Sequence, residues 1–286
     1  MYRIQPLKGE SAKKEKKTGF KKVKSIHFLG IPYYVILLVL IIIPLFLIFF
    51  YAITTQEEGL FYRITLEHFK VFFTEKSYLK TMWDSIFLAI ITTLICLIIG
   101  YPTAYIISKQ RPKMQTFLIL LVTVPMWINL LILTLAWKQI FEMINPKILG
   151  TNFAIITGMV NIYLPFMVIP IYTVLTKISP RLYEAATDLG ANNFKTFLKV
   201  TLPLSLGGVL SGVTMVLLPA ATTIVIPSKL GQGRYLIGSL IEDRFFFAGN
   251  WSQGAAIAII LAIIIMALIF LTKRLDKTHE VDYDEN

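Results

Sequence analysis

Side chains able to do chemistry are sparse in this sequence, and their spacing argues against catalysis. The three histidines, His27, His68 and His279, lie in separate segments, which argues against a metal or catalytic cluster. The only cysteine, Cys96, stands in an apolar run and is most simply a small buried residue. No G-x-x-x-x-G-K-[ST], H-E-x-x-H or G-x-S-x-G motif occurs. The sequence therefore predicts a chain that is not an enzyme and carries no metal site or P-loop of its own.

The polar stretch EAATDLGANNFKTFLKVTLP, residues 184–203, and the residues just before it are more organised than a connector needs. Ser179 and Pro180 predict a helix start, with serine as the N-cap and proline at the first helical position. The residues that recur at i, i+3, i+4 and i+7 form one apolar stripe; they are Leu182, Ala185, Ala186 and Leu189.

Gly190 is placed to end this first helix, and Asn192 or Asn193 can cap a second helix over 194–200. The pattern thus predicts two short helices joined at a glycine, with Pro203 starting the next long helix. The small alanines form a narrow ridge, which suits docking into a groove of another protein. The alternative is an interfacial helix that lies on lipid.

Long apolar runs must position these residues. The 286 residues are 56% hydrophobic and 16% charged, with a mean hydropathy of +0.68, which places the chain in the membrane class. A helix needs roughly 20 residues to cross the hydrocarbon layer. Six runs meet this length and predict an all-α protein with six membrane spans, near 30–53, 82–107, 115–137, 153–175, 203–226 and 253–272.

The first run is too long for the apolar part of a signal peptide and lacks a convincing cleavage site, so it is read as a retained span. Three parts follow: a basic segment 1–28, a membrane domain 29–272 containing the loop 176–202, and a tail 273–286.

The distribution of charge predicts the orientation. The formal net charge is +11, and nineteen of the 28 Lys and Arg residues fall in segment 1–28, in the loops 108–114 and 176–200, and in the tail. Basic residues favour the cytoplasmic side, so both termini and the 176–200 loop are expected there, in a multi-pass protein of the cell membrane. Segment 1–28 offers no fold or aromatic pattern for nucleic acid and is read as a topology anchor that touches anionic lipid.

The loop carries a family signature. Its residues fit E-A-A-x3-G-x9-[IV]-x-L-P at every position, and the chain therefore resembles the permease subunits of ABC importers. The resemblance implies the type I importer fold, a cytoplasmic coupling helix and a dimer of separate ATPase subunits that bind ATP and Mg²⁺. It also implies coupling roles for Glu184, Ala185, Ala186, Asp188 and Gly190.

Further blocks narrow the resemblance. TVPMWINLLILTLAW (123–137), NIYLPFMVIPIY (161–172), LPAATTIVIPSKLGQG (218–233), YLIGSLIEDRFF (235–246) and NWSQGAAIAI (250–259) are similar to the first permease of spermidine/putrescine importers. This implies a second permease and an extracellular binding protein as partners. The chain departs from this branch at Leu133, Gln232 and Ser252, and the change at Leu133, near the presumed path, weakens the inference about the substrate.

A polyamine is a polycation with apolar methylenes, so its path should offer carboxylates and aromatic faces. Asp84 is the only acid in the predicted spans; the alternative is an interfacial or N-capping residue. The resemblance favours Trp127 and Tyr163 as path residues. The other candidates are Asn129, Asn161, Thr222 and Thr223. For each of them, as for Trp127 and Tyr163, interhelical hydrogen bonding or packing is an equal alternative.

These observations predict a permease subunit of an ATP-driven importer, with polyamines as the expected solute. The alternatives are a permease for another small solute in the same branch, a membrane scaffold that recruits a soluble partner without transport, and an intramembrane enzyme. Gly208 and Gly212 add a small-residue pair that permits close helix contact, within the chain or with a second permease.

Overall fold

The computed structural model describes residues 34–56 and 62–276, with side chains as far as residue 271. Contacts divide the chain into two units, 1–47 and 48–286. The predicted basic segment 1–28 and residues 277–286 of the predicted tail lie outside the described residues. In the first unit, η1 (Leu38–Ile42) and the beginning of α2 (Ile43–Ala52) belong to a continuous apolar helix that starts at Tyr34.

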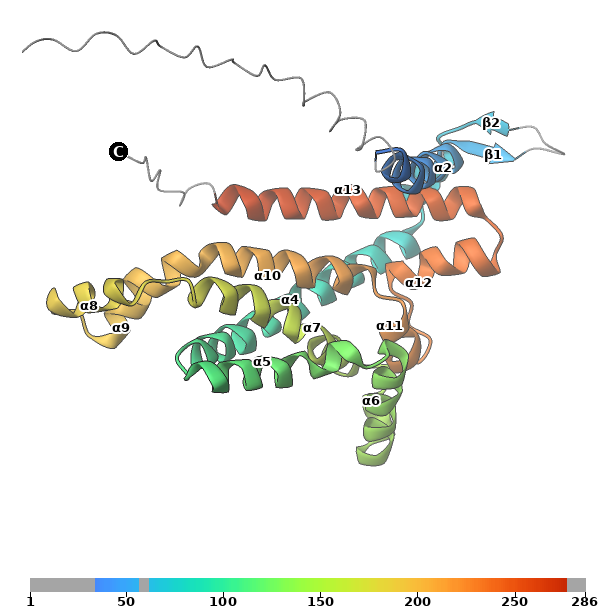
Figure 1. The fold of residues 1–286 in the computed structure, drawn as a ribbon. Coiled ribbons are helices and arrows are strands. Elements are labelled where there is room, and N and C mark those ends of the chain that lie inside the picture. The colour runs from blue at the N-terminus through green and yellow to red at the C-terminus, as the bar shows by residue number, and fades with distance from the viewer. Residues whose placement is uncertain (1–33, 57–61, 277–286) are drawn as a thin grey trace, which may run out of the picture. The chain divides into compact units, whose positions relative to one another are not determined.

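After the end of α2, the second unit contains a small strand pair that the sequence did not predict. Strands β1 (Thr54–Gln56) and β2 (Tyr62–Ile64) pair antiparallel, with Thr54 opposite Ile64, and α3 (Glu67–Thr74) follows them. Phe72 is 1% exposed and anchors α3 to the core of the helices. Apart from this short strand pair, the described elements are helical, as the sequence predicts (Figure 1).

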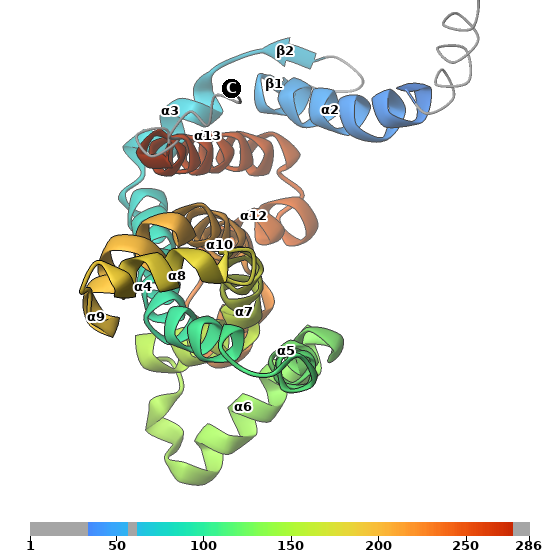
Figure 2. The same ribbon diagram turned by 60° about the vertical axis from the view of Figure 1, so that its left-hand side comes forward.

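Four long helices form the bundle of this unit (Figures 1 and 2): α4 (Lys76–Ser108), α7 (Asn152–Leu175), α10 (Leu202–Thr222) and α13 (Trp251–Asp276). The predicted span 153–175 matches α7, whereas α4 starts six residues before the predicted 82. Helices α4, α7 and α10 pack against one another through buried apolar side chains such as Leu88, Met167 and Val216. Gly208 and Gly212 lie against α7, so their close contact is within the chain.

The predicted third span is not one continuous helix. α5 (Pro112–Trp127) and α6 (Leu130–Ile144) meet at 91°, and Figure 1 shows α6 turning away from α5. The break falls at Ile128 and Asn129, three residues after Pro125, where the backbone becomes extended. Among the described residues, five helices are long and apolar enough to cross a membrane, or six if this bent pair is one span.

The predicted fifth span also differs at both ends. Pro203 does not start it, because α9 (Asn193–Thr196), the π-helical turn η3 (Phe197–Thr201) and α10 form one continuous helical stretch, 193–222. A proline inside a helix lacks the N–H that would donate to an earlier carbonyl, and the π-helical turn η3 just before Pro203 lets the helix continue despite this missing donor. α10 ends at Thr222, four residues before the predicted 226.

Short elements complete the unit. The turn η2 (Pro146–Ile148) joins α6 to α7, and α8 (Pro180–Asp188) lies between α7 and α9. α11 (Val225–Leu230), α12 (Ile237–Glu242) and η4 (Asp243–Phe247) lead from α10 to α13. Figure 1 places α8 and α9 at one end of the long helices and α11 and α12 at the other.

Candidate functional site

The loop that carries the E-A-A pattern forms the two predicted helical segments around Gly190, but the start of the first and the extent of the second differ from the prediction. Pro180 occupies the first position of α8, but the Ser179 side chain makes no capping hydrogen bond. Gly190 has a φ of +77°, and its N–H donates to the Thr187 carbonyl at 2.8 Å. The N–H of Ala191 donates to the Ala186 carbonyl at 3.0 Å, which completes a Schellman motif.

The second helix is capped by Asn192, one of the two asparagines predicted for this role. Asn192 Oδ1 accepts a hydrogen bond of 2.8 Å from the Lys195 N–H. Because α9 continues into α10, this second helix is the end of a long helix rather than a separate one. The helical stretch 193–222 therefore reaches from the coupling segment into the bundle.

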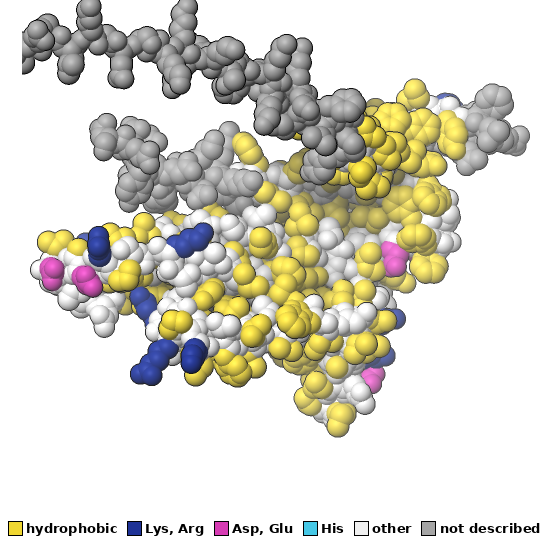
Figure 3. Space-filling view, viewed as in Figure 1, with side chains coloured by type: hydrophobic (Ala, Val, Ile, Leu, Met, Phe, Trp, Pro, Cys, Tyr) yellow, Lys and Arg dark blue, Asp and Glu magenta, His cyan; other side chains and the backbone are white. Residues whose placement is uncertain are grey.

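The predicted apolar stripe of α8 lies on the surface. No residue of α8 is buried, and the side chains of Leu182 and Leu189 are 43% and 88% exposed. Glu184, Ala185 and Asp188 are exposed as well, and Ala186 is half-buried. Figure 3 shows the basic side chains gathered mainly at this end, together with two acidic ones. The helix thus presents a small apolar ridge with charged borders to solvent, which is suited to contact with another protein.

The predicted path residues Trp127 and Asn129 flank the break between α5 and α6. Trp127 is the last residue of α5, and its side chain is 79% exposed. Asn129 is the N-cap of α6, and its Oδ1 accepts a hydrogen bond of 2.9 Å from the Leu131 N–H. The Asn129 amide oxygen thus stabilises the start of α6.

Tyr163 links α7 to the end of α10 by a hydrogen bond. Its side chain is 7% exposed, and its hydroxyl donates to the Pro219 carbonyl at 3.3 Å. That carbonyl is one of the last four of α10, which have no partner within the helix. Thr222, the last residue of α10, donates its hydroxyl to the Leu218 carbonyl at 3.0 Å.

Two polar side-chain atoms, one in α7 close to Tyr163 and one at the end of α10, have unused hydrogen-bonding capacity. Asn161 Oδ1 is buried and has no hydrogen-bond partner among the described residues. Thr223 Oγ1 is also buried; it lies near the Tyr163 hydroxyl but forms no hydrogen bond of good geometry. Burying an unpaired polar group is unfavourable, so such atoms mark places where a ligand, water or another chain can contribute. Among the predicted path residues, Tyr163, Asn161 and Thr223 are thus the ones whose polar groups are best suited to contact a ligand.

Asp84 belongs to a different cluster. It lies within α4, well after the helix start at Lys76, so the N-capping alternative is wrong. Its Oδ2 is 3.9 Å from Nη2 of Arg234, whose Nη1 donates to Asn152 Oδ1 at 2.6 Å. Asn152 begins α7, and Tyr163 follows it by about 16 Å along the helix at 1.5 Å per residue. The carboxylate and the buried tyrosine are therefore not brought together.

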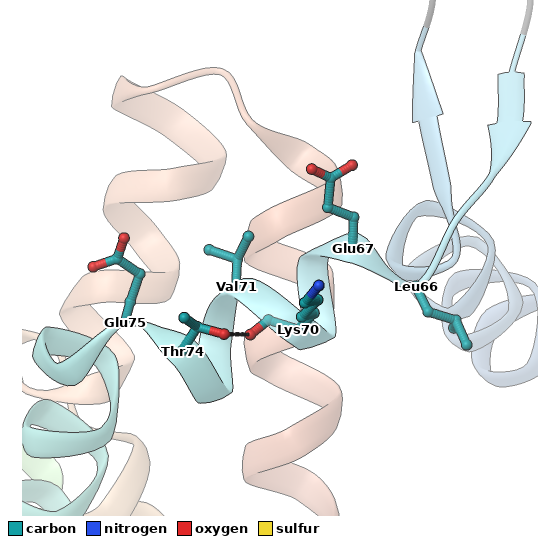
Figure 4. Close-up of a pocket in the computed structure, with 6 residues that line it drawn as sticks. All are labelled: Leu66, Glu67, Lys70, Val71, Thr74 and Glu75. Atoms are coloured by element: carbon teal, nitrogen blue, oxygen red, sulfur yellow. Dashed lines mark hydrogen bonds between the residues drawn. The ribbon is translucent and has the colours of Figure 1, made fainter.

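A surface pocket on α3 collects two further carboxylates. It has a volume of about 580 Å³, and Figure 4 shows Glu67, Val71 and Glu75 in one row along the helix. The Thr74 hydroxyl donates to the Lys70 carbonyl at 2.8 Å and is not directed at these acids. The two carboxylates lie outside the long helices and form no enclosed site.

Sequence reasoning missed three residues of these clusters, namely Lys109, Tyr183 and Arg234. Lys109 Nζ lies 3.6 Å from the ring centroid of Tyr183 in α8, and Arg234 pairs with Asp84. Their partners are distant in sequence, so no local pattern marks them. The only sequence signal is the position of Lys109 in the basic loop between α4 and α5.

Comparison with known proteins places this geometry among transport proteins. The profile of the family described as "Binding-protein-dependent transport system inner membrane component" matches residues 96–280. The spermidine/putrescine transport system permease protein PotB of Haemophilus influenzae is 36% identical over 244 residues, covering 79% of this chain and 85% of that protein. PotB of Escherichia coli is 35% identical over 212 residues, covering 68% and 76%.

Solved structures share the fold at low sequence identity. A bacterial ABC transporter involved in the import of the acidic polysaccharide alginate gives a TM-score of 0.72 at 14% identity, covering 90% of this chain and 96% of its own. The MetNI methionine ABC transporter in an inward-facing conformation gives 0.60 at 19% identity, covering 70% and 94%.

Proposed function

This chain belongs to the family of binding-protein-dependent transport system inner membrane components, and we propose that it is a permease subunit of an ATP-driven importer of polyamines. The main support is the pair of spermidine/putrescine permeases that match across most of the chain. The five or six helices among the described residues that could cross a membrane are consistent with this role.

The exposed ridge of α8 supports the proposal about energy coupling. A dimer of separate ATPase subunits binds ATP and Mg²⁺, and one of them receives α8 through Glu184, Ala185, Ala186, Asp188 and Gly190. Closure of the ATPases on ATP moves α8 and α9, and the continuous helix 193–222 carries that movement into the bundle. Both termini and α8 then face the cytoplasm, as the basic residues predict.

The remaining partners follow from the same role. A second permease completes the path, and an extracellular binding protein delivers the solute to the end that carries Asp84. One solved relative of the same fold is an alginate transporter in complex with its alginate-bound periplasmic protein, which supports this kind of partner. The exposed apolar helices of the chain face lipid or the second permease.

The proposed path uses the chemistry of a flexible polycation. Asp84 attracts an ammonium group at the outer end, and the aromatic faces of Trp127 and Tyr163 contact ammonium groups and methylenes. The oxygens of Asn161 and Thr223 then offer acceptors that the chain itself leaves unused. Asn129 and Thr222 are the remaining residues of the proposed path.

Glu184→Lys tests the coupling part of the proposal. In cells expressing this chain with its ATPase, second permease and binding protein, uptake of labelled spermidine or putrescine should be lost, while the chain remains in the membrane. The ATPase should no longer co-purify, because a cation replaces the carboxylate at the border of the ridge. Glu142→Lys, at an exposed position of α6, is the matched control and should transport normally.

The same experiment separates the alternatives. Normal uptake by Glu184→Lys would contradict the coupling role of α8. A wild-type complex that recruits the ATPase without moving any solute is a scaffold. Uptake of a different solute, with no competition from spermidine or putrescine, would leave the permease role in place and overturn the polyamine assignment.

A further inference from the structure

The contact between Lys109 and Tyr183 joins the α4–α5 turn to α8. Lys109 follows the last residue of α4, and Tyr183 lies in the first turns of α8. The Lys109 Nζ is 3.6 Å from the centroid of the Tyr183 ring and 5.5 Å from that of Tyr105. A cation within about 6 Å of an aromatic ring is attracted to its face. The carbonyl end of α4 also favours a positive charge at this position.

Few other side chains hold α8 against the long helices. None of its residues is buried, and Tyr183 is only half-buried. A pocket of about 340 Å³, lined by Lys109, Gln115, Pro180 and Tyr183 among others, lies beside its first turn. Consecutive residues lie about 100° apart around a helix, so Tyr183 reaches Lys109 without covering the apolar ridge that starts at Leu182.

The turn that carries Lys109 is itself firmly connected to the bundle. Gln115 Nε2 donates to the carbonyls of Ser108 and Gln110 at 3.0 and 2.8 Å. Gln115 Oε1 accepts a hydrogen bond of 3.0 Å from the hydroxyl of Tyr172 in α7. A movement passed to Lys109 therefore reaches α4, α5 and α7 together.

The same end of α4 also contacts the second half of the coupling segment. The rings of Tyr101 and Tyr105 pack edge-on against Phe197 of η3, with centroids 5.8 and 5.4 Å away. The Tyr101 hydroxyl and Ser205 Oγ of α10 are 2.8 Å apart. α4 thus contacts η3 through its aromatic side chains and α8 through Lys109.

We propose that Lys109 is a positioning residue that fastens α8 to the α4–α5 turn, so that movement of α8 reaches α4, α5 and α7 as well as α10. This inference rests on the proposed importer function. Without the contact, an ATPase can still dock on the exposed ridge, but its movement enters the bundle mainly through the helix 193–222. Hydrolysis of ATP then becomes poorly linked to solute movement.

The test compares ATP hydrolysis with uptake in the complete transporter, reconstituted with binding protein and spermidine. Lys109→Gln should leave co-purification of the ATPase unchanged and raise the ATP consumed per solute by about fivefold, the scale of one cation–π contact. Lys109→Arg should restore the wild-type ratio, since a guanidinium also binds an aromatic face. Lys113→Gln removes an equal charge from the neighbouring turn and should have no effect.

A double change tests whether the two side chains act through each other. Tyr183→Leu should match Lys109→Gln, and the double variant should be no worse than either single one. Tyr183→Phe keeps the ring and should couple normally. Additive losses, a normal ratio in Lys109→Gln, or loss of the ATPase from that variant would each overturn the proposal.

A second measurement does not depend on transport. In the purified full chain in lipid nanodiscs, Lys109→Gln should speed amide hydrogen exchange in residues 181–189 by about fivefold, whereas Lys113→Gln and Lys109→Arg should not. Unchanged exchange would overturn the fastening role even in a working importer. Faster exchange in a chain whose complex moves no solute would instead leave the fastening intact and reject the proposed function.

Discussion

Gly208 of α10 lies directly against Ile171 of α7. A Cβ added at this glycine would be 3.1 Å from the Ile171 Cα and 3.0 Å from the Pro170 carbonyl oxygen. Both neighbours are backbone atoms, which cannot rotate away as a side chain can. The approach of the two helices is therefore set at this point by the absence of a side chain.

Gly208→Leu should force α10 and α7 apart. Overpacking a well-packed core costs about 1–3 kcal/mol, and the backbone contact favours the upper part of that range. We expect a lower melting temperature of the purified chain and less protein in the membrane. Gly207→Leu is the matched control, because no atom lies within 4 Å of a Cβ at this neighbouring glycine. Equal effects of the two changes would show that helix contact is not the cause.

The coupling segment could be predicted from the sequence because its signals are local. Pro180, Gly190 and Asn192 act within one or two turns of where they stand, and each has the role expected of its type. The spacing of the apolar stripe needs only the period of one helix. The same local rules were wrong at Pro203, because a π-helical turn lets the helix continue through it.

The other parts of the candidate site depend on contacts between distant residues. Asp84 meets Arg234 across 150 positions of sequence, and Lys109 meets Tyr183 across 74. The bend after Trp127 was also missed, because an apolar run has the same composition whether it is straight or broken. Pro125 lies three residues before the break, and the capping role of Asn129 decides where the second helix begins.

Asp84→Asn should weaken the uptake of cationic solutes. A charge-assisted hydrogen bond contributes about 1.5–3 kcal/mol. Loss of such a bond between Asp84 and an ammonium group of spermidine should therefore raise the KM for spermidine about tenfold. The ion pair with Arg234 is partly exposed and its atoms are 3.9 Å apart, so stability should change little. Glu142→Gln removes an exposed acid elsewhere and should leave KM unchanged. The same KM in both variants would mean that Asp84 does not contact the solute and serves only in its ion pair with Arg234.

Ala185→Phe should prevent docking of the ATPase. The alanine is exposed on the ridge of α8, so a large ring alters the surface without disturbing a packed core. We expect the variant to accumulate normally but to lose ATPase co-purification and uptake by more than about tenfold, as when a contact of 1.4 kcal/mol or more is lost. Thr187→Phe, exposed on another face of α8, should retain both. Retained association in Ala185→Phe would mean that the ridge does not enter a groove.

Gly190→Val should uncouple the two halves of the coupling segment through the backbone alone. The glycine has a φ of +77°, and no atom lies within 4 Å of an added Cβ, so the substitution creates strain without a collision. A left-handed conformation costs a non-glycine residue about 1–2 kcal/mol, and a β-branched residue is the least tolerant. The Schellman hydrogen bond between Ala191 and Ala186 should therefore open more often, which faster amide exchange at residue 191 would report. Gly190→Asn is the control, since asparagine adopts this conformation more readily, and it should retain most of the protection. If the amide of residue 191 exchanges at the same rate in the valine and asparagine variants, the conformation of Gly190 does not hold the turn between α8 and α9.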